Sequence, residues 1–485
     1  MNGHEWVECL LGAFKAGVVP INVNYRYTAD ECRYLFDNAD LVGLIYQDRY
    51  EQLVFDAGHA APGLRLALRI ETDATHAQGE RPDSVPEPRD YETELAAAPT
   101  ERPTEGRSPD DLYILYTGGT TGMPKGVMWR HEDVFFTLGG GFDIDGNAVA
   151  SPLTLAERAA EGFNLTYFVL PPLMHGAGQW GSLRSLFEGH TIVLSPAASF
   201  DPEAAWQTVA DARVNVIIAT GDAMARPLVE TLAADPTRFD TSSLLAFGST
   251  AAIFSRAVKN QFFELMPNIV LTDSIGSTET GFSGLAQVTK DTDMKAGPTV
   301  VPGAETIVVD DDMNPLPPGT GQTGRIARSG HVPLGYYKDP DKTAATFPVV
   351  NGVRYVIPGD FAIYEADGTI TLLGRGSQCI NTGGEKVYPE EVEAILKEHP
   401  DVFDVLVVGI PDDRFGQRVA AVVQARPDAQ PTLEALSAHC RAQLAGYKLP
   451  RALVLVDTVP RLPNAKPDYR EAKRIAEESS ATTSA

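Results

Sequence analysis

The sequence of 485 residues has few cysteines and no long apolar run. Its four cysteines are scattered and form no CxxC pair, which disfavours a disulfide scaffold and a structural zinc site. No apolar run reaches ~18 residues, the length that a membrane-spanning helix needs. The first residues include Glu5 and Glu8, where a signal peptide would be basic and then apolar. We therefore expect a cytoplasmic protein without a transmembrane segment.

Basic residues are also in deficit. The chain has 40 Lys and Arg against 65 Asp and Glu, a formal net charge of −25. Such a surface argues against general nucleic-acid binding and against docking on anionic membranes. Hydrophobic residues make up 43% of the chain, so it is not disordered overall. At about 150 residues per domain the length allows roughly three folding units, with ample material for a core.

The first three hundred residues alternate between helical and strand-like patterns. Apolar periodicity predicts helices over 5–20 and 30–39, then a buried strand over 41–46. Residues 71–110 are rich in Pro, Glu, Thr and Asp and predict a long surface loop. Further strands are predicted at 113–116, 167–170, 191–194 and 214–219, with helices at 202–212 and 222–234. This alternation predicts an α/β fold with substantially parallel sheets.

Beyond residue 300 the pattern changes. Short runs separated by turns predict an antiparallel β subdomain, with strands at 306–309, 324–327, 355–357 and 369–373. A compact pattern then predicts a separate small α+β domain, with helices at 389–398 and 431–445 and strands at 402–410, 418–425 and 451–456. The last seven residues, SSATTSA, predict a frayed tail.

The strongest chemical signal is the segment YTGGTTGMPKGV at residues 116–127. A predicted strand enters a loop with four glycines, three threonines and Lys125. Glycines let backbone N–H groups approach an anion, and the hydroxyls and the ammonium add donors and charge, which suits a triphosphate. The segment is not a Walker loop, because Pro124 precedes the lysine. The simpler interpretation is a glycine-rich turn that binds nothing.

Two other glycine segments, at residues 176–181 and 319–324, fit the pattern GxGxxG. A lone GxGxxG is a weak signal unless it follows a strand and opens a helix. The first segment follows a proline pair and His175, and the second lies in proline-rich turn sequence. A dinucleotide-binding fold, and with it a nucleotide-dependent dehydrogenase, is therefore an outside alternative.

The loop at 116–127 resembles the phosphate-binding signature of the adenylate-forming superfamily, which includes acyl-CoA synthetases, firefly luciferases and the adenylation domains of peptide synthetases. Other segments resemble the motifs of this family in the same order, at 275–281, 358–360, 374–375, 382–386, 389–393, 444–450 and 462–470. The resemblance covers nearly the whole chain. The amino-acid sequence of these segments is most similar to that of actinobacterial fatty-acyl or steroid-side-chain acyl-CoA synthetases.

The resemblance implies a two-domain α/β architecture. Residues 1–374 would form a large domain of stacked, mostly parallel sheets with helices and a β subdomain. Residues 375–485 would form a small, mobile α+β C-terminal domain. The sequence starts inside the first helical region of the family, so we expect that a typical N-terminal segment is missing.

The resemblance also assigns roles to individual residues. The implied catalytic groups are Lys466, which offsets charge in the transition state, His175, a gate beside the acyl carboxylate, and Thr278 near the α-phosphate. Glu279, with Thr121, would hold Mg²⁺. The implied contacts to ATP or AMP are Thr117, Gly118, Gly119, Thr120, Thr121, Gly122, Lys125, Gly248, Ser249, Thr250, Ile275, Gly276, Asp360 and Arg375.

A second group of implied residues serves coenzyme A and domain movement. Gly383 and Gly384 would form a narrow passage for the CoA thiol, with Lys386 nearby, and Ser377 would be the hinge. Residues around Gly178, Trp180 and Phe247 are candidates for the pocket that binds the acyl chain. Outside a matched motif, a lysine near a C-terminus is usually a solvated surface charge and a buried histidine a satisfied core residue.

Three positions depart from the family pattern. Ile275 replaces the aromatic residue that usually stacks on adenine, Ser377 stands where many relatives have Asp or Lys, and Ala465 replaces the glycine before the catalytic lysine. None of these changes removes a charged catalytic group.

The sequence thus predicts an ATP-dependent carboxylic acid–CoA ligase, an acid–thiol ligase that forms acyl-AMP and then acyl-CoA. Its substrates would be ATP, coenzyme A and a fatty or steroid-side-chain acid, with Mg²⁺ as cofactor and no nucleic-acid partner. Members of the family are often homodimers, so the resemblance implies a possible homodimer. Two alternatives stay open: an enzyme that loads a carrier protein instead of free CoA, and a catalytically silent ligand-binding relative.

Overall fold

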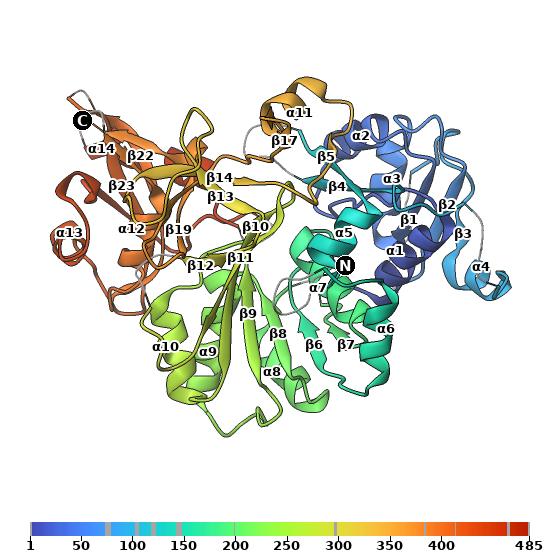
Figure 1. Ribbon diagram of the computed structural model, residues 1–485, viewed down its shortest axis with the longest axis horizontal. Helices are drawn as coiled ribbons and strands as arrows, with labels where there is room; N and C mark the ends of the chain where they lie inside the picture. The colour runs from blue at the N-terminus through green and yellow to red at the C-terminus, as the bar shows by residue number, and fades with distance from the viewer. Residues whose placement is uncertain are drawn as a thin grey trace.

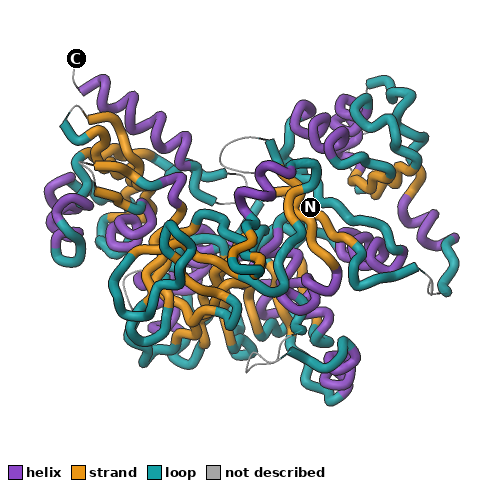
Figure 2. Tube along the Cα trace, turned by 45° about the horizontal axis from the view of Figure 1, so that its top comes forward, coloured by secondary structure: helices purple, strands orange, loops and turns teal. Residues whose placement is uncertain are grey.

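The computed structural model describes residues 2–72, 79–101, 106–117, 123–141, 148–197, 199–294, 298–382, 385–412, 414–462 and 466–483. The chain has an α/β fold, as predicted. In both views of the molecule, the first helices and strands lie at one end, the residues from β20 onward lie at the other end, and a large sheet lies between them (Figures 1 and 2). Among the described residues, no helix is long and apolar enough to cross a membrane.

The N-terminal end contains a parallel three-stranded sheet, in the order β1-β2-β3, with its helices. Helix α2 begins at a capping box, in which Thr28 accepts from the backbone N–H of Glu31 and the Glu31 side chain accepts from that of Thr28. The elements are α1 (His4–Ala16), α2 (Ala29–Asn38), β1 (Gly43–Gln47), α3 (Glu51–Gly58), β2 (Leu66–Ile70), β3 (Arg89–Asp90) and α4 (Tyr91–Ala97).

The prediction of a surface loop over 71–110 is wrong for residues 89–97, which form β3 and α4. Asp90 caps α4 by accepting a hydrogen bond from the Thr93 backbone N–H. Tyr91 is buried and donates its hydroxyl to Glu8 of α1, 3.0 Å away. The helix is therefore stabilised by a contact between distant segments, which the local composition does not reveal.

One half of the large sheet is parallel, with strands in the order β10-β9-β8-β6-β7. Its strands confirm the predicted βα alternation, and α8 and α9 match the helices predicted at 202–212 and 222–234. The elements are α6 (Leu153–Ala160), β6 (Thr166–Val169), α7 (Gly176–Phe187), β7 (Thr191–Leu194), α8 (Pro202–Asp211), β8 (Val216–Ala219), α9 (Gly221–Ala234), β9 (Ala246–Thr250), α10 (Arg256–Leu265) and β10 (Val270–Ser277).

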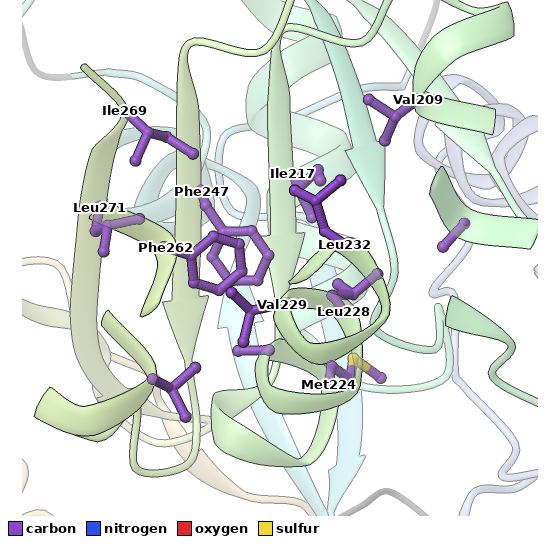
Figure 3. Packing of buried hydrophobic residues seen from close by; sticks show 14 of the residues in the cluster. Val209, Ile217, Met224, Leu228, Val229, Leu232, Phe247, Phe262, Ile269 and Leu271 are labelled. Carbon is purple, nitrogen blue, oxygen red and sulfur yellow. The ribbon is translucent and has the colours of Figure 1, made fainter. Parts of the chain in front are cut away.

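A buried apolar cluster lies between this half of the sheet and α8, α9 and α10 (Figure 3). The rings of Phe247 on β9 and Phe262 on α10 have their centroids 4.8 Å apart, and both side chains are fully buried. Phe247 is thus a core residue, and the acyl pocket predicted around it stays a prediction. Because side chains alternate along a strand, the neighbouring Gly248 belongs to the opposite face of the sheet.

The other half of the large sheet is antiparallel and continues from β10 in the order β11-β12-β19-β18-β14-β13. The predicted β subdomain thus shares one continuous sheet with the parallel strands. Residues 355–357 form no strand, because Val356 makes only an isolated bridge to Arg328. The elements are β11 (Gly281–Val288), β12 (Thr299–Pro302), β13 (Thr306–Val309), β14 (Thr323–Arg328), β18 (Asp360–Tyr364) and β19 (Ile370–Arg375).

Strands β4 and β5 of a smaller antiparallel sheet, in the order β15-β5-β4, flank the predicted phosphate loop at residues 118–122. Strand β15 is short, but it pairs with β5 across more than two hundred residues of sequence. The elements here are β4 (Leu112–Thr117), β5 (Lys125–Arg130), α5 (His131–Leu138), β15 (Gly335–Tyr336) and α11 (Pro340–Thr346), with the hairpin of β16 (Val349–Val350) and β17 (Val353–Arg354) beside them.

The C-terminal residues form a five-stranded sheet with helices on both faces. Val405 and Val407 of β22 belong to one apolar cluster and Leu406 and Val408 to another, so this strand is buried on both sides. The elements are β20 (Ile380–Thr382), β21 (Glu385–Val387), α12 (Pro389–Leu396), β22 (Val402–Asp412), β23 (Gly416–Ala425), α13 (Leu433–Arg441), β24 (Ala452–Val456) and α14 (Tyr469–Thr483).

These elements confirm the helices and strands predicted after residue 389. The predicted frayed tail is wrong for residues 479–483, which complete α14. Residues Ala472 and Ala476 of this helix are fully buried against β22 and its neighbours, which anchors the helix to the sheet. The division of the chain at residues 374 and 375 stays a prediction.

Candidate active site

The phosphate-loop segment connects two paired strands. Thr117 at the end of β4 lies opposite Lys125 at the start of β5. The Lys125 Nζ lies 2.8 Å from the Asp339 Oδ2 and 5.6 Å from the centroid of the Tyr336 ring. The loop positions between the strands, Gly118, Gly119, Thr120, Thr121 and Gly122, lie outside the described residues.

The segment at 275–281 forms the turn between β10 and β11. The register shifts between Ile275 and Gly276, and a Cβ on Gly276 would lie only 1.9 Å from the carbonyl oxygen of Gly281, so this position requires glycine. The backbone carbonyl of Thr278 accepts a hydrogen bond from the indole of Trp129 at 3.0 Å. The Glu279 Oε1 accepts one from the hydroxyl of Tyr336 at 2.8 Å. The turn therefore has a fixed geometry.

The segment 248–250 lies at the carboxyl end of β9, between β8 and β10. In an open α/β sheet this end of the parallel strands is where ligands bind. The Ser249 side chain is buried and accepts a hydrogen bond from the Gly221 N–H at 2.9 Å, at the start of α9. Ile275 packs against the apolar cluster that includes Ala362 and Ile370.

Asp360 and Arg375 face each other across β18 and β19. The Arg375 Nε lies 3.1 Å from the Asp360 Oδ1. The negative charge of Asp360, followed by those of Glu279 and Glu390, raises the pKa of the Arg375 guanidinium, while burial lowers it. The pair presents a carboxylate and a guanidinium at the junction between the large sheet and the C-terminal residues.

Lys466 lies near this pair although it comes from the end of the chain. The Leu462 N–H donates to the Lys466 carbonyl at 2.8 Å, which closes the loop that carries the lysine. Lys466 is an exposed residue, but the protein around its ammonium displaces part of the surrounding water. This desolvation, followed by the charge of Arg375, lowers the pKa of the ammonium. The charges of Glu279 and Asp360 act in the opposite direction. The structure thus brings Lys466 within electrostatic reach of three predicted site residues.

His175 precedes the first residue of α7 and belongs to the same group. Burial lowers the pKa of its imidazole to about 4, with smaller contributions from the positive charges of Lys466 and Arg26. Its Nε2 is buried and has no hydrogen-bond partner within the described parts of the chain. The imidazole is therefore neutral at physiological pH and carries a polar atom that a ligand could satisfy.

The predicted CoA and hinge residues are only partly described. Gly383 and Gly384 lie outside the described residues. The Lys386 Nζ on β21 lies 5.7 Å from the ring centroid of Phe361, next to Asp360. Ser377 follows Arg375 in a short 3₁₀ turn (Gly376–Gln378), and its side chain is not described.

Sequence reasoning missed three positions around the site. Tyr336 and Asp339 contact predicted site residues, and the only local signal is the Asp-Pro step that starts α11. Asn22 gave no signal, yet its buried side-chain amide donates to the carbonyls of Tyr116 and Met174 and accepts from the Tyr116 N–H, at 2.7–3.0 Å. It ties the strand before the phosphate loop to the loop before His175.

No group of three or more His, Cys, Asp or Glu side chains that could hold a metal ion occurs among the residues that the structure describes. At the predicted site, Asp360 pairs with Arg375 and Asp339 with Lys125, whereas the carboxylate of Glu279 accepts only the neutral Tyr336 hydroxyl among the described contacts and is the predicted metal ligand. This donor set fits Mg²⁺, which usually takes one or two carboxylates and completes its shell with substrate phosphates and water.

The fold and this arrangement of charges agree with the predicted class, an enzyme that activates its substrate with a nucleotide, and the comparisons with known proteins establish the family. Residues 1–337 match the family model of AMP-binding enzymes, and residues 391–466 match the C-terminal domain of the same enzymes. The chain belongs to the AMP-binding enzyme family, whose CoA ligases use ATP and coenzyme A as substrates.

Curated relatives support this membership over nearly the full length. The medium/long-chain-fatty-acid–CoA/3-oxocholest-4-en-26-oate–CoA ligase of Mycolicibacterium smegmatis is 50% identical over 98% of this chain and 86% of its own length. The 3-oxocholest-4-en-26-oate–CoA ligase of Rhodococcus rhodochrous is 49% identical over 97% of this chain and 85% of its own length. The predicted resemblance and the predicted ligase class are confirmed.

A solved structure supports the fold. The anthranilate CoA ligase AuaEII in complex with anthranoyl-AMP has a TM-score of 0.81 and 22% identity, and the match covers 99% of this chain and 87% of that one. At this identity the likeness concerns the fold alone.

Proposed function

We propose that this protein is an ATP-dependent carboxylic acid–CoA ligase that acts on a medium- or long-chain fatty acid or a steroid-side-chain acid. The observation that supports this proposal most directly is that charged and polar side chains from four separate regions of the chain lie within electrostatic reach of one another: Lys466, Glu279, Asp360, Arg375 and His175. The names of the relatives, which act on fatty acids and 3-oxocholest-4-en-26-oate, support this substrate class.

In the first half-reaction, a carboxylate oxygen of the acid attacks the α-phosphorus of ATP. A new P–O bond forms, the bond to the leaving pyrophosphate breaks, and acyl-AMP results. Negative charge accumulates where the acid and the α-phosphate meet, because both reactants are anionic. Lys466, which approaches the site from the C-terminal residues, offsets this charge. Lys125 and the loop at 118–122 would bind the β- and γ-phosphates and the leaving pyrophosphate.

The other site residues orient the nucleotide. Asp360 would accept hydrogen bonds from the ribose hydroxyls, with Arg375 supporting it, and residues 248–250 would lie along the adenine. Glu279 and Thr121 would hold Mg²⁺, which when bound neutralises phosphate charge. Ile275 offers adenine an apolar contact in place of an aromatic ring.

His175 acts as a neutral group. With a pKa of about 4, its imidazole brings no positive charge to compete with Lys466 for the carboxylate. A neutral imidazole can still offer one N–H donor or one acceptor to the acid.

In the second half-reaction, the sulfur of CoA attacks the acyl carbonyl carbon, and the bond to AMP breaks. We propose that the residues after Ser377 rotate between the half-reactions, so that Lys466 withdraws and the Gly383–Gly384 segment reaches the site. The thiol proton leaves to solvent or to the AMP phosphate as the thioester forms.

Two further expectations belong to this proposal. All four cysteines are free thiols, which supports a reducing, cytoplasmic location. A homodimer is proposed by analogy with relatives, and sedimentation analysis tests it.

The direct test is AMP release from ATP with a panel of acids, each with and without CoA. The panel contains short, medium and long fatty acids, aryl acids and a steroid-side-chain acid. Release that CoA stimulates for the fatty or steroid acids is the expected result. Release that CoA does not stimulate supports the carrier-protein alternative, and ATP binding without release for any acid supports a silent relative.

Lys466→Ala tests the assigned catalytic group. We expect acyl-AMP formation to fall about 10²–10³-fold, the usual cost of removing one group that stabilises transition-state charge. Thioester formation from acyl-AMP supplied ready-made should persist. Lys473→Ala, an exposed lysine on α14, is the matched control. Wild-type acyl-AMP formation by the Lys466 variant would disprove the assignment.

A further inference from the structure

Tyr336 lies between two predicted groups of the triphosphate site. Its hydroxyl donates to the Glu279 Oε1 at 2.8 Å, and its ring centroid lies 5.6 Å from the Lys125 Nζ. The side chain is only 5% exposed. Glu279 and Lys125 are separated by more than 150 residues, so this one aromatic residue links the predicted metal carboxylate to the phosphate-loop lysine.

Several contacts fix the position of Tyr336. Its backbone pairs with Val127 in the β15–β5 ladder, two residues after Lys125. Its N–H donates to the Thr343 Oγ1 at 2.9 Å, and its ring meets Phe347 edge-on at 5.7 Å. A Cβ on the preceding Gly335, whose φ is +143°, would lie 2.3 Å from the Thr343 side chain, so the close approach depends on glycine.

Asp339 holds Lys125 from the other side. Its Oδ2 lies 2.8 Å from the Lys125 Nζ, and its Oδ1 accepts from the Lys342 N–H at 3.0 Å as the N-cap of α11. The Asp339 carboxylate is therefore held in place by the first turn of α11. Lys125 is oriented by the Tyr336 ring and the Asp339 carboxylate together.

We propose that Tyr336 is a positioning residue that orients both Glu279, the carboxylate that would hold Mg²⁺, and Lys125, the ammonium that would bind the ATP phosphates. The inference rests on the proposed function and extends it to residues outside the family motifs that the sequence reveals. A carboxylate and an ammonium that are oriented before the ligand arrives cost less to arrange when it binds. The phenol donates to the Glu279 Oε1 and so fixes the orientation of the carboxylate, whose other oxygen would remain available to a metal ion.

The matched pair of variants is Tyr336→Phe and Tyr337→Phe. Both remove one hydroxyl and keep the ring. The Tyr337 hydroxyl donates to the Asp40 Oδ2 at 2.7 Å, outside the predicted site, so its loss controls for the substitution itself. Circular dichroism and thermal unfolding establish that both variants fold.

Calorimetric binding of a non-hydrolysable ATP analogue, without acid or CoA, is the readout. We expect Tyr336→Phe to weaken binding in the presence of Mg²⁺ about tenfold, a typical loss for a hydrogen bond to a charged group. Binding in EDTA should stay within about twofold of the wild type, because Glu279 then has no metal to hold. Tyr337→Phe should resemble the wild type in both conditions.

A double-mutant cycle shows whether Tyr336 acts through Glu279. In a Glu279→Gln background, Tyr336→Phe should add little to the loss of Mg²⁺-dependent binding. Equal affinities of Tyr336→Phe and Tyr337→Phe for the Mg²⁺-bound ATP analogue, or an additive effect in the cycle, would overturn the inference about Tyr336. The proposed function would still stand if the wild type binds the analogue with Mg²⁺. Absence of ATP binding by the wild type would overturn both.

Discussion

The low pKa of His175 makes acid stability a probe of the site. Burial lowers this pKa from 6.5 to about 4, so the unfolded chain binds a proton at pH 5 that the folded chain does not. Acid therefore favours the unfolded state, and stability is lost as the pH falls from about 6.5 towards 4. His175→Gln, which keeps a polar side chain without this titration, removes that loss.

The size of the effect follows from the two pKa values. A gap of this size lowers the free energy of unfolding by about 2 kcal/mol at pH 5, and by about 3 kcal/mol below pH 4, relative to pH 8. Other groups titrate in the same interval, so the informative quantity is the difference between the wild type and His175→Gln. We expect that difference to change by about 2 kcal/mol between pH 8 and pH 5.

Urea unfolding at a series of pH values measures this difference. His59→Gln, at the exposed end of α3, is the matched control and should keep the acid sensitivity of the wild type. NMR of ¹³Cε1-labelled histidine reads the pKa of His175 directly, and Lys466→Ala should raise it because a nearby positive charge is lost. A His175 resonance that titrates near pH 6.5, or equal acid losses in the wild type and the His175 variant, would refute the reasoning.

Two further predictions concern charged pairs. Asp360→Asn removes the carboxylate that lies 3.1 Å from Arg375. In the AMP-release assay, we expect the KM for ATP to rise at least about tenfold and the KM for the acid to change less. An unchanged KM for ATP would contradict the assignment of Asp360 to the ribose. Arg256→Gln removes the 2.6 Å ion pair with Glu398. We expect limited proteolysis after Arg375 to accelerate, while the free energy of unfolding changes by less than about 1 kcal/mol. Arg474→Gln, on the exposed face of α14, is the control, and equal cleavage rates in the two variants would count against the predicted mobility of the C-terminal domain.

The sequence predicted those elements whose pattern is local. The βα alternation around α8 and α9 follows from apolar periodicity, and the continuous apolar run of β22 follows from burial on both faces. Helix α4 could not be predicted in this way, because its stability depends on the burial of Tyr91 against α1. Residues 479–483 show the same limit, since their polar composition gives no sign that the buried alanines of α14 anchor the helix.

The candidate site shows the same difference between what local sequence predicts and what it does not. The motif residues Glu279, Asp360 and Lys466 could be identified one by one from their segments. Their mutual placement could not, because it arises from strand pairing and from the docking of the C-terminal residues. Asp339 lies 214 positions from Lys125, and only the β15–β5 pairing brings the two together.

Three ion pairs join the C-terminal residues to α9 and α10, an arrangement that suits the domain movement proposed above. They join Arg256 with Glu398, Arg426 with Glu230, and Lys397 with Asp222. An apolar interface of similar extent would resist opening, because about 25 cal/mol would be lost for each Å² returned to water.

A buried charge that loses its partner costs several kcal/mol, so the ionic surface is useful only if no charge is left alone when it opens. Lys397 also lies 3.2 Å from Asp404 of its own sheet, and Asp222 also lies 3.3 Å from Arg226 of its own helix. Each member of the most buried pair thus keeps a partner on its own side. If the residues after Ser377 rotate as proposed, Lys397 and Asp222 each keep a partner, so separating this pair carries only a small electrostatic cost.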